Sequence, residues 1–299
     1  MKIGHSEIFA LETGMFKLDG GAMFGTVPKP IWEKAIPPDE QNRIPMALRI
    51  ILLRDFKTKR NLLIDTGIGT KWPEKLATIY GIDHSKFTLQ KALSEHDLKP
   101  EDITDVILTH LHFDHAGGAT LPESEGAALL GEGHAAKFKP TFPNAKYYIQ
   151  KDNLDWAMDP NSREAASYLP ENFKPLIESK KLIVCDGIED FEKKINWPGV
   201  SVRLSYGHTI GLQCPLINLD GKIFFYPSDM IPTASHLPVP WVMGYDIHVI
   251  KLLEEKEILL AEAVKDNWIF VYEHDPVLPA TTVIKGSKHY SRGDLVNLA

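Results

Sequence analysis

Short apolar runs recur along the chain with the length and spacing of buried strands. They are rich in Val, Ile, Leu, Phe and Tyr, and turn residues separate several of them, as Asp220-Gly221 does. Runs without polar alternation are typical of strands that are covered on both faces. We predict strands over residues 47–53, 61–64, 106–108, 147–149, 200–204, 216–219, 222–226 and 268–272.

Segments with helical spacing lie between and after these runs. Residues 250–264 place leucines and an alanine on one face with charged residues between them, which predicts an amphipathic helix. Residues 89–96 follow the same spacing and end before Pro100, and residues 151–158 form a third candidate helix. Strands that alternate with helices and hairpins predict a mixed α/β layer architecture, with residues 1–299 as one domain.

Two apolar segments, residues 20–32 and 231–245, contain several prolines. Because proline lacks the backbone N–H that helices and central strands use, we expect both segments to be irregular.

Composition and charge narrow the class of protein. Hydrophobic residues make up 43% and charged residues 24%, as in ordinary globular proteins. The formal net charge of −7 disfavours nucleic acids and anionic membranes as partners. The absence of a membrane-length apolar run or a signal-like N-terminus favours a cytoplasmic protein. Cys185 and Cys214 form no CxxC motif, and we expect two reduced core thiols.

The strongest chemical signal follows the predicted strand at 106–108. His110 and His112 are two residues apart, so on an extended backbone their imidazoles face the same way and can chelate one metal ion. Asp114 continues that alternation. In α/β sheets, ligands collect where strands end and loops begin, which is where this segment lies.

His115 breaks the alternation by one residue and needs a turn of the chain to face the same site. We expect Gly117 and Gly118 to supply that turn. The segment would then present two pairs of ligands, His110 with His112 and Asp114 with His115, to neighbouring metal ions.

Three further predicted strands run into a histidine or an aspartate: His208, Asp229 and His274. One such residue is more often structural, but together they complete a set of five histidines and two aspartates. Imidazoles and carboxylates without a thiolate suit zinc, with Mn, Fe and Co as alternatives. Asp229 has two carboxylate oxygens and is our candidate to bridge two metal ions. The remaining histidines, His5, His84, His96, His134, His248 and His289, are interpreted as structural or exposed.

The pattern His-x-His-x-Asp-His, followed by distant His, Asp and His, resembles the metallo-β-lactamase superfamily. The strand-end segment Asn61-Leu62-Leu63-Ile64-Asp65-Thr66-Gly67 is similar to its early aspartate motif. The resemblance implies a four-layer αββα sandwich with two metal ions at one edge. It implies one metal on His110, His112 and His208, another on Asp114, His115 and His274, a bridge at Asp229, and an orienting role for Asp65.

Residues 20–25 and 228–238 are most similar to a narrower group, the YtnP-like acyl-homoserine lactonases and the methyl parathion hydrolase-type phosphotriesterases. The chain departs from the best-known lactonases at Pro232, where they carry a tyrosine, so Tyr245 or another residue would have to replace that phenol. His112 replaces the glutamate of the diiron flavoprotein relatives, Ile210 replaces a frequent proline, and no cysteine ligand is present.

The resemblance implies a hydrolase in which a hydroxide that bridges the metals opens small lactones or esters, as in quorum quenching. Asp114 would pass a proton to the leaving alkoxide. Phosphotriesters, glyoxalase II-type thioesters and nucleic acids are the alternative substrates, and a metal-binding interaction protein is the non-enzymatic alternative. A homodimer is left open.

A substrate pocket is predicted from the two proline-containing segments. Its candidate residues are Met23, Phe24, His236 and Trp241. The competing interpretation is ordinary packing beneath long loops for the apolar residues and a structural role for His236.

Overall fold

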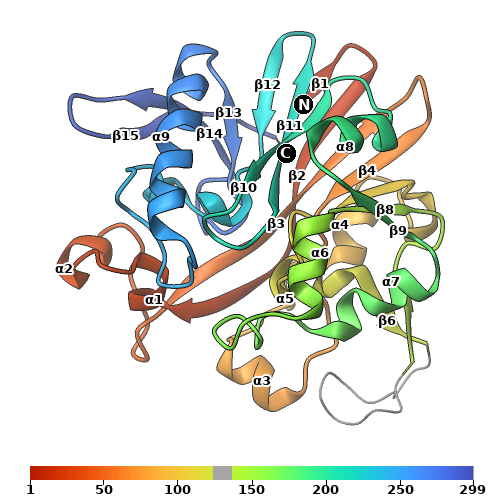
Figure 1. Cartoon of the computed structure of the whole chain (residues 1–299), viewed down its shortest axis with the longest axis horizontal. Helices are drawn as coiled ribbons and strands as arrows, with labels where there is room; N and C mark the ends of the chain where they lie inside the picture. Colours follow the sequence, from red (N-terminus) through yellow and green to blue (C-terminus); the bar gives the residue numbers. More distant parts are fainter. Residues whose placement is uncertain (124–136, 299) are drawn as a thin grey trace.

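The computed structural model describes residues 1–123 and 137–298, and His134 lies outside them. Figure 1 shows the chain arranged around two large β-sheets. The first sheet has the strand order β1-β2-β3-β4-β5-β8-β9, and the second has the order β10-β11-β12-β13-β14-β15. The first comprises β1 (Lys2–Ile3), β2 (Ser6–Asp19), β3 (Arg43–Asp55), β4 (Arg60–Ile64), β5 (Asp105–Ile107), β8 (Lys146–Gln150) and β9 (Leu182–Cys185). The second comprises β10 (Val200–Ser205), β11 (Leu212–Leu219), β12 (Lys222–Phe225), β13 (Ile269–Val271), β14 (Ala280–Lys285) and β15 (Tyr290–Leu295).

Helices cover the outer face of each sheet (Figure 1). The described helices are α1 (Gly20–Phe24), α2 (Lys29–Trp32), α3 (Glu74–Ile79), α4 (Leu89–Ser94), α5 (Phe113–Ala116), α6 (Lys151–Met158), α7 (Lys174–Glu178), α8 (Ile188–Ile195) and α9 (Val249–Lys265). A short third sheet pairs β6 (Thr120–Pro122) with β7 (Phe138–Pro140). Within the described part of the chain, no helix is both long enough and apolar enough to cross a membrane.

Side-chain alternation along the strands divides the core into layers. On β3, Ile50 and Leu52 pack against α4, while Ile51 and Leu53 point to the opposite face and meet the second sheet. Successive strand residues face opposite sides of a sheet, so a strand buried on both sides must be apolar at every position. This accounts for the unbroken apolar runs in the sequence.

The outer layer on the second sheet is α9. Its residues Leu252, Leu259 and Leu260 pack with Phe225 and Phe270 of the sheet. Together with the helices on the first sheet, α9 completes the helix–sheet–sheet–helix order of an αββα sandwich, and the predicted fold class is confirmed.

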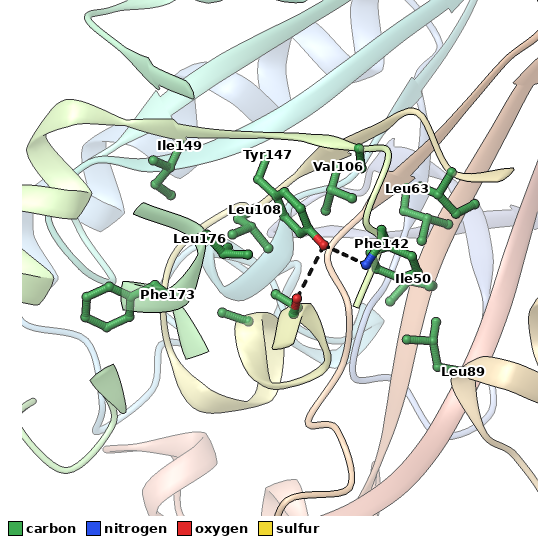
Figure 2. Packing of buried hydrophobic residues seen from close by; sticks show 14 of the residues in the cluster. Ile50, Leu63, Leu89, Val106, Leu108, Phe142, Tyr147, Ile149, Phe173 and Leu176 are labelled. Atoms are coloured by element: carbon green, nitrogen blue, oxygen red, sulfur yellow. Dashed lines mark hydrogen bonds between the residues drawn. The ribbon is translucent and has the colours of Figure 1, made fainter. Parts of the chain in front are cut away.

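Figure 2 shows the core between the first sheet and its helices. Tyr147 is one of two buried tyrosines in this apolar layer, and its hydroxyl is fully engaged. It accepts a hydrogen bond from the backbone N–H of Phe142 at 3.0 Å and donates to the carbonyl of Ala119 at 3.3 Å. Because a buried hydroxyl without partners costs free energy, these two bonds make a tyrosine tolerable here. They also tie the end of the 110–119 segment to β8.

The predicted strands and the three predicted helices all correspond to elements of the structure. The thiols of Cys185 and Cys214 are free and buried, as expected. The expectation for residues 20–32 was wrong in part, because they contain the short helices α1 and α2. Pro28 precedes α2 and Pro30 lies in its first turn, where the missing N–H has no helical partner to lose.

The sheet topology brings the critical strand ends to one edge of the sandwich. β4 pairs with β5 in parallel, and β12 pairs with β13 in parallel. Their carboxyl ends therefore open on the same side, as do the loops that follow them. The backbone of β3 also bonds the loop after β13, with Ala47 N–H donating to His274 O at 3.2 Å.

Candidate metal centre

The segment after β5 runs extended through His110 and His112 and then turns into the helix α5. Asp114 and His115 lie on that one-turn helix, so the helix itself rotates His115 towards the site. The expectation that Gly117 and Gly118 supply the turn was wrong. Both glycines instead allow a close approach, since a Cβ on either would collide with the carbonyl oxygen of Ile68 or Thr66.

Seven buried side chains from four strand ends meet at this edge. They form two groups, and Asp229 belongs to both. Within each group, all the ligand atoms lie within 4.8 Å of one another. One carboxylate oxygen of Asp229 lies 3.2 Å from His208 Nε2, and the other lies 3.1 Å from His274 Nε2. The first group is His110, His112, His208 and Asp229, and the second is Asp114, His115, His274 and Asp229.

The carboxylate–imidazole contacts on the outer side fix how two of the first group's histidines face inward. His208 Nδ1 donates to Asp246 Oδ1 at 2.9 Å. His112 Nε2 donates to Glu164 Oε1 at 3.3 Å. A neutral imidazole that gives its proton to an outer acceptor keeps a lone pair on the other nitrogen. The inward atoms, His208 Nε2 and His112 Nδ1, are therefore free to bind a cation.

Two carboxylates hold His115 in the same way. Its Nδ1 lies 3.0 Å from Asp65 Oδ2 and 2.9 Å from Glu273 Oε2. Asp65 also accepts from the backbone N–H and the hydroxyl of Thr109, both at 2.7 Å. Asp65 thus ties β4 to the segment that carries His110 and orients His115, which is the contact expected of an orienting residue.

The loop after β13 is held by β3. His274 Nδ1 donates to the carbonyl of Ala47 at 2.9 Å. The buried Arg49 guanidinium donates to the carbonyls of Tyr272 and Asp275, on either side of His274, at 2.5 and 3.0 Å. These contacts leave His274 Nε2 facing the site.

Several nitrogen and oxygen atoms that face the centre of the site lack a hydrogen-bond partner. His115 Nε2, His274 Nε2 and Asp229 Oδ1 are buried without a hydrogen-bond partner. Buried polar atoms are rarely left in this state, and here lone pairs of imidazoles and carboxylates converge on each other. A divalent cation in each group would satisfy them, so the donor set fits two metal ions.

The ligand side chains differ in their electrostatics. Against the effect of burial, the neighbouring carboxylates raise the pKa of His115, His208 and His274, so a metal ion that binds there would replace their protons. Burial, helped by the neighbouring imidazoles, lowers the pKa of His110 well below its usual value, so its ring is neutral at pH 7. Burial opposes the charged form of Asp229, but His115, His274 and His208 together hold its pKa well below the usual range. The site therefore combines an ionised central carboxylate with a neutral ligand imidazole.

Three carboxylates of the site were not predicted from the sequence. Glu273 directly precedes His274, and its position beside a ligand at a strand end could have identified it. Glu164 and Asp246 lie 52 and 38 residues from the histidines they contact, in irregular segments. No local pattern marks such contacts.

Replacing Asp246 with asparagine is expected to weaken metal binding and turnover by about 10- to 100-fold, the range for loss of an outer-sphere carboxylate. Asparagine cannot both accept from His208 Nδ1 and from the Met243 N–H, to which Asp246 Oδ2 now bonds at 2.7 Å. Metal titration of the variant checks this.

The matched control is Asp55→Asn. Asp55 is also buried and also accepts backbone N–H groups, from Lys57 and Thr58, but it lies on β3 away from the metal centre. Equal losses in metal affinity for the two variants would argue against an orienting role for Asp246.

An apolar cavity of about 230 Å³ opens onto the metal centre. His112, Asp114, His208 and Asp229 line it at the metal side. Its apolar wall consists of Leu18, Met23, Met46, Phe113 and Met243. Methionines adapt their shape readily, so this wall suits an aliphatic group of variable form.

Of the predicted pocket residues, Met23 lines this cavity. Phe24 is fully buried behind it, with its ring stacked on Trp32 at 5.3 Å and on His236 at 4.7 Å between centroids. Trp241 packs edge-on against Phe24 at 5.8 Å. The structure therefore places Phe24 and Trp241 behind the wall instead of on it.

His236 also faces away from the cavity. Its ring nitrogens contact Thr233 Oγ1 and the carbonyl of Met23, both at 2.8 Å. Burial lowers the pKa of His236 to about 3, so the ring is neutral. With both nitrogens engaged, His236 supports the Met23 backbone and has no nitrogen left for a substrate.

Two phenols reach the cavity, those of Tyr80 and Tyr245. Burial raises the pKa of Tyr245 to about 12, so its hydroxyl stays protonated at neutral pH and can donate a hydrogen bond. Tyr245 lies directly before Asp246, which binds His208. The cavity thus contains a phenol, although Pro232, three residues after Asp229, occupies the position at which the resemblance implied a tyrosine.

Comparisons with known proteins agree with this geometry. The profile of the metallo-beta-lactamase superfamily matches residues 49–274. The N-acyl homoserine lactonase AiiB of Rhizobium rhizogenes is 29% identical over 248 residues, which cover 79% of this chain and 80% of that protein.

Solved structures show the same fold. A probable metal-dependent hydrolase from Staphylococcus aureus superposes with a TM-score of 0.82 at 31% identity, over 99% of this chain and 100% of that one. AidC, a dizinc quorum-quenching lactonase, has a TM-score of 0.76 at 22% identity, over 99% of this chain and 97% of its own.

Proposed function

This chain belongs to the metallo-beta-lactamase superfamily of hydrolases, and we propose that it is a binuclear metal-dependent hydrolase that opens small lactones and cleaves small esters. The observation that carries the proposal is Asp229, whose ionised carboxylate belongs to both ligand groups at the end of an apolar cavity. The lactonase relative AiiB, similar over most of its length, favours lactones among the possible esters.

The side chains divide into two sets around Asp229. His110, His112 and His208 would hold one cation, and Asp114, His115 and His274 would hold the other. When bound, the two cations supply a water of lowered pKa and a positive charge that polarises an ester oxygen. Five imidazoles with carboxylates favour zinc, and the lactonase AidC is itself a dizinc enzyme.

Asp114 is the residue we assign to proton transfer. Its carboxylate lines the cavity and lies 3.6 Å from His274 Nε2 and 3.8 Å from His115 Nε2, so it faces both the ligands and the substrate space. It would take the proton of the attacking water and return it to the leaving alkoxide. In a lactone that alkoxide stays attached to the acyl group, so the product is one open hydroxy acid.

Tyr245 and the methionine wall position the substrate in this proposal. The protonated phenol of Tyr245 would donate a hydrogen bond to a substrate oxygen. Met23, Met46 and Met243 would hold the acyl chain by apolar burial. Both contacts come from the chain itself and do not depend on the metal.

A substrate panel tests the proposal. The zinc-loaded protein is assayed with an N-acyl homoserine lactone, an acyclic aliphatic ester, an aryl phosphotriester and an S-acyl glutathione thioester. We expect kcat/KM to be highest for the lactone, by at least about 10-fold, a factor that corresponds to about 1.4 kcal/mol. A metal-loaded protein that turns over neither lactone nor ester would refute the proposal, and a preference for the phosphotriester or thioester would move the activity to that class.

A further inference from the structure

Arg163 stands out among the residues around the cavity because its charge is positive. Of the described residues that line the cavity, it is the one arginine, and none is a lysine. It lines the cavity together with Glu164, Ala166 and Ser167, while Met243 and Tyr245 line the cavity from a distant segment of the chain. A substrate that occupies the cavity would therefore lie near the positive charge of Arg163.

A hydrogen bond ties the Arg163 side chain to a distant segment of the cavity lining. Its guanidinium donates to the carbonyl of Gly244, between Met243 and Tyr245. Its backbone N–H donates to Asn161 Oδ1 at 2.8 Å, which fixes the turn on its own side. The arginine is exposed to solvent, but these bonds fix both its backbone and its guanidinium.

The Arg163 charge has no protein counterion. In residues 1–123 and 137–298, no carboxylate lies within 4.0 Å of its guanidinium, whereas four of the seven arginines, Arg43, Arg49, Arg60 and Arg203, each form an ion pair. The adjacent carboxylate of Glu164 is occupied, since it accepts from His112 Nε2 at 3.3 Å and from Trp156 Nε1 at 2.8 Å.

Guanidinium carries five N–H donors in a planar fork that matches a carboxylate. The bond to Gly244 uses one of them, so others remain for a ligand. We propose that Arg163 is a specificity-determining residue that binds a carboxylate carried by the substrate away from the scissile bond. The preferred substrates are then small lactones or esters with one negative charge.

This inference rests on the proposed hydrolase function and deepens it. The charge of the cavity lining supports it, because two divalent cations would balance the three carboxylates, Asp114, Glu164 and Asp229, and one hydroxide, which leaves the charge of Arg163 in excess. An anionic substrate is attracted to such a positive charge.

Two esters of equal length and the same leaving group test the inference in the zinc-loaded enzyme: 4-nitrophenyl hexanoate, which is neutral, and mono-4-nitrophenyl adipate, which ends in a carboxylate. Wild-type kcat/KM is expected to be at least about 10-fold higher for the adipate, the size of one charge-assisted contact. Arg163→Gln should remove about 10- to 100-fold from the adipate value, mainly through KM, and change the hexanoate value less than about 3-fold.

Arg203→Gln is the matched control, because Arg203 is a partly exposed arginine that pairs with Glu262 at 3.6 Å and is not among the cavity residues. It should leave both esters unchanged, and Arg163→Lys should retain part of the preference. Equal wild-type rates for the two esters, or a preference that survives in Arg163→Gln, would overturn the inference while leaving the hydrolase intact. Failure of the wild type on both esters would instead overturn the proposed function and this inference with it.

Discussion

Replacing Asp229 with asparagine is expected to lower lactone and ester turnover by at least about 10³-fold, on the order of 4 kcal/mol of transition-state stabilisation. Asp229 belongs to both ligand groups, with contacts of 3.1 to 3.3 Å to His274, His208 and His115. An amide has one oxygen acceptor and no charge, so it cannot serve both groups. The measurement is steady-state hydrolysis by the zinc-loaded variant.

The fold must survive the Asp229 substitution for the loss to be interpretable. Circular dichroism and a thermal melt of the metal-free variant establish this, and Asp55→Asn again serves as a buried aspartate outside the site. If a folded Asp229→Asn protein kept turnover within about 10-fold of wild type, which is less than about 1.4 kcal/mol, the carboxylate would not be the shared ligand.

Removal of metal by a chelator is expected to abolish turnover and to lower the thermal midpoint by roughly 10 °C. A ligand at 1,000 times its Kd stabilises the native state by about 4 kcal/mol, and a chain of this size shifts by a few degrees for each kcal/mol. The physical reason is that buried, unpartnered atoms such as His115 Nε2 and His274 Nε2 face carboxylate oxygens when no cation is present.

Zinc added back should restore both the midpoint and the activity, whereas magnesium should restore neither, because imidazole-rich sites disfavour it. The Asp229→Asn variant is the control, since its midpoint should respond little to zinc. Identical melting curves with and without chelator would show that the site is stable as an empty polar cluster and would argue against resident metal ions.

The clustering of the seven candidate ligands could be predicted because its sequence signals are local. His110, His112, Asp114 and His115 lie within six residues. His208, Asp229 and His274 each follow a short apolar run of the kind that indicates a buried strand. Parallel pairing of β4 with β5 and of β12 with β13 then brings these strand ends to one edge. The fold class followed from the same alternation of runs and helices.

What the sequence could not reveal depends on tertiary contacts between distant segments. Glu164 reaches His112 across 52 residues, and Arg163 reaches Gly244 across 81, from loops without periodicity. The direction of a side chain in a short element is equally hidden. Met23 and Phe24 are neighbours in the short helix α1, yet one faces the cavity and the other the core.

The long strand β2 was missed for a different reason. Its sequence interrupts the apolar pattern with charges such as Glu7 and Glu12, so no unbroken apolar run marks it. β2 pairs with β3 over nearly its whole length, and that pairing, rather than its own pattern, defines it. The glycines Gly117 and Gly118 were misinterpreted because sequence cannot distinguish a turn from a close backbone approach.

The number of metal ions bound per chain is the most direct test of the proposed binuclear site. Wild-type protein, stripped by chelator and equilibrated with zinc, is passed into metal-free buffer, and metal is measured against protein by mass spectrometry. Because the ligand atoms form two groups that share Asp229, we predict two zinc ions per wild-type chain and at most one in Asp229→Asn. A wild-type chain that retains one ion or none under these conditions would contradict the binuclear site.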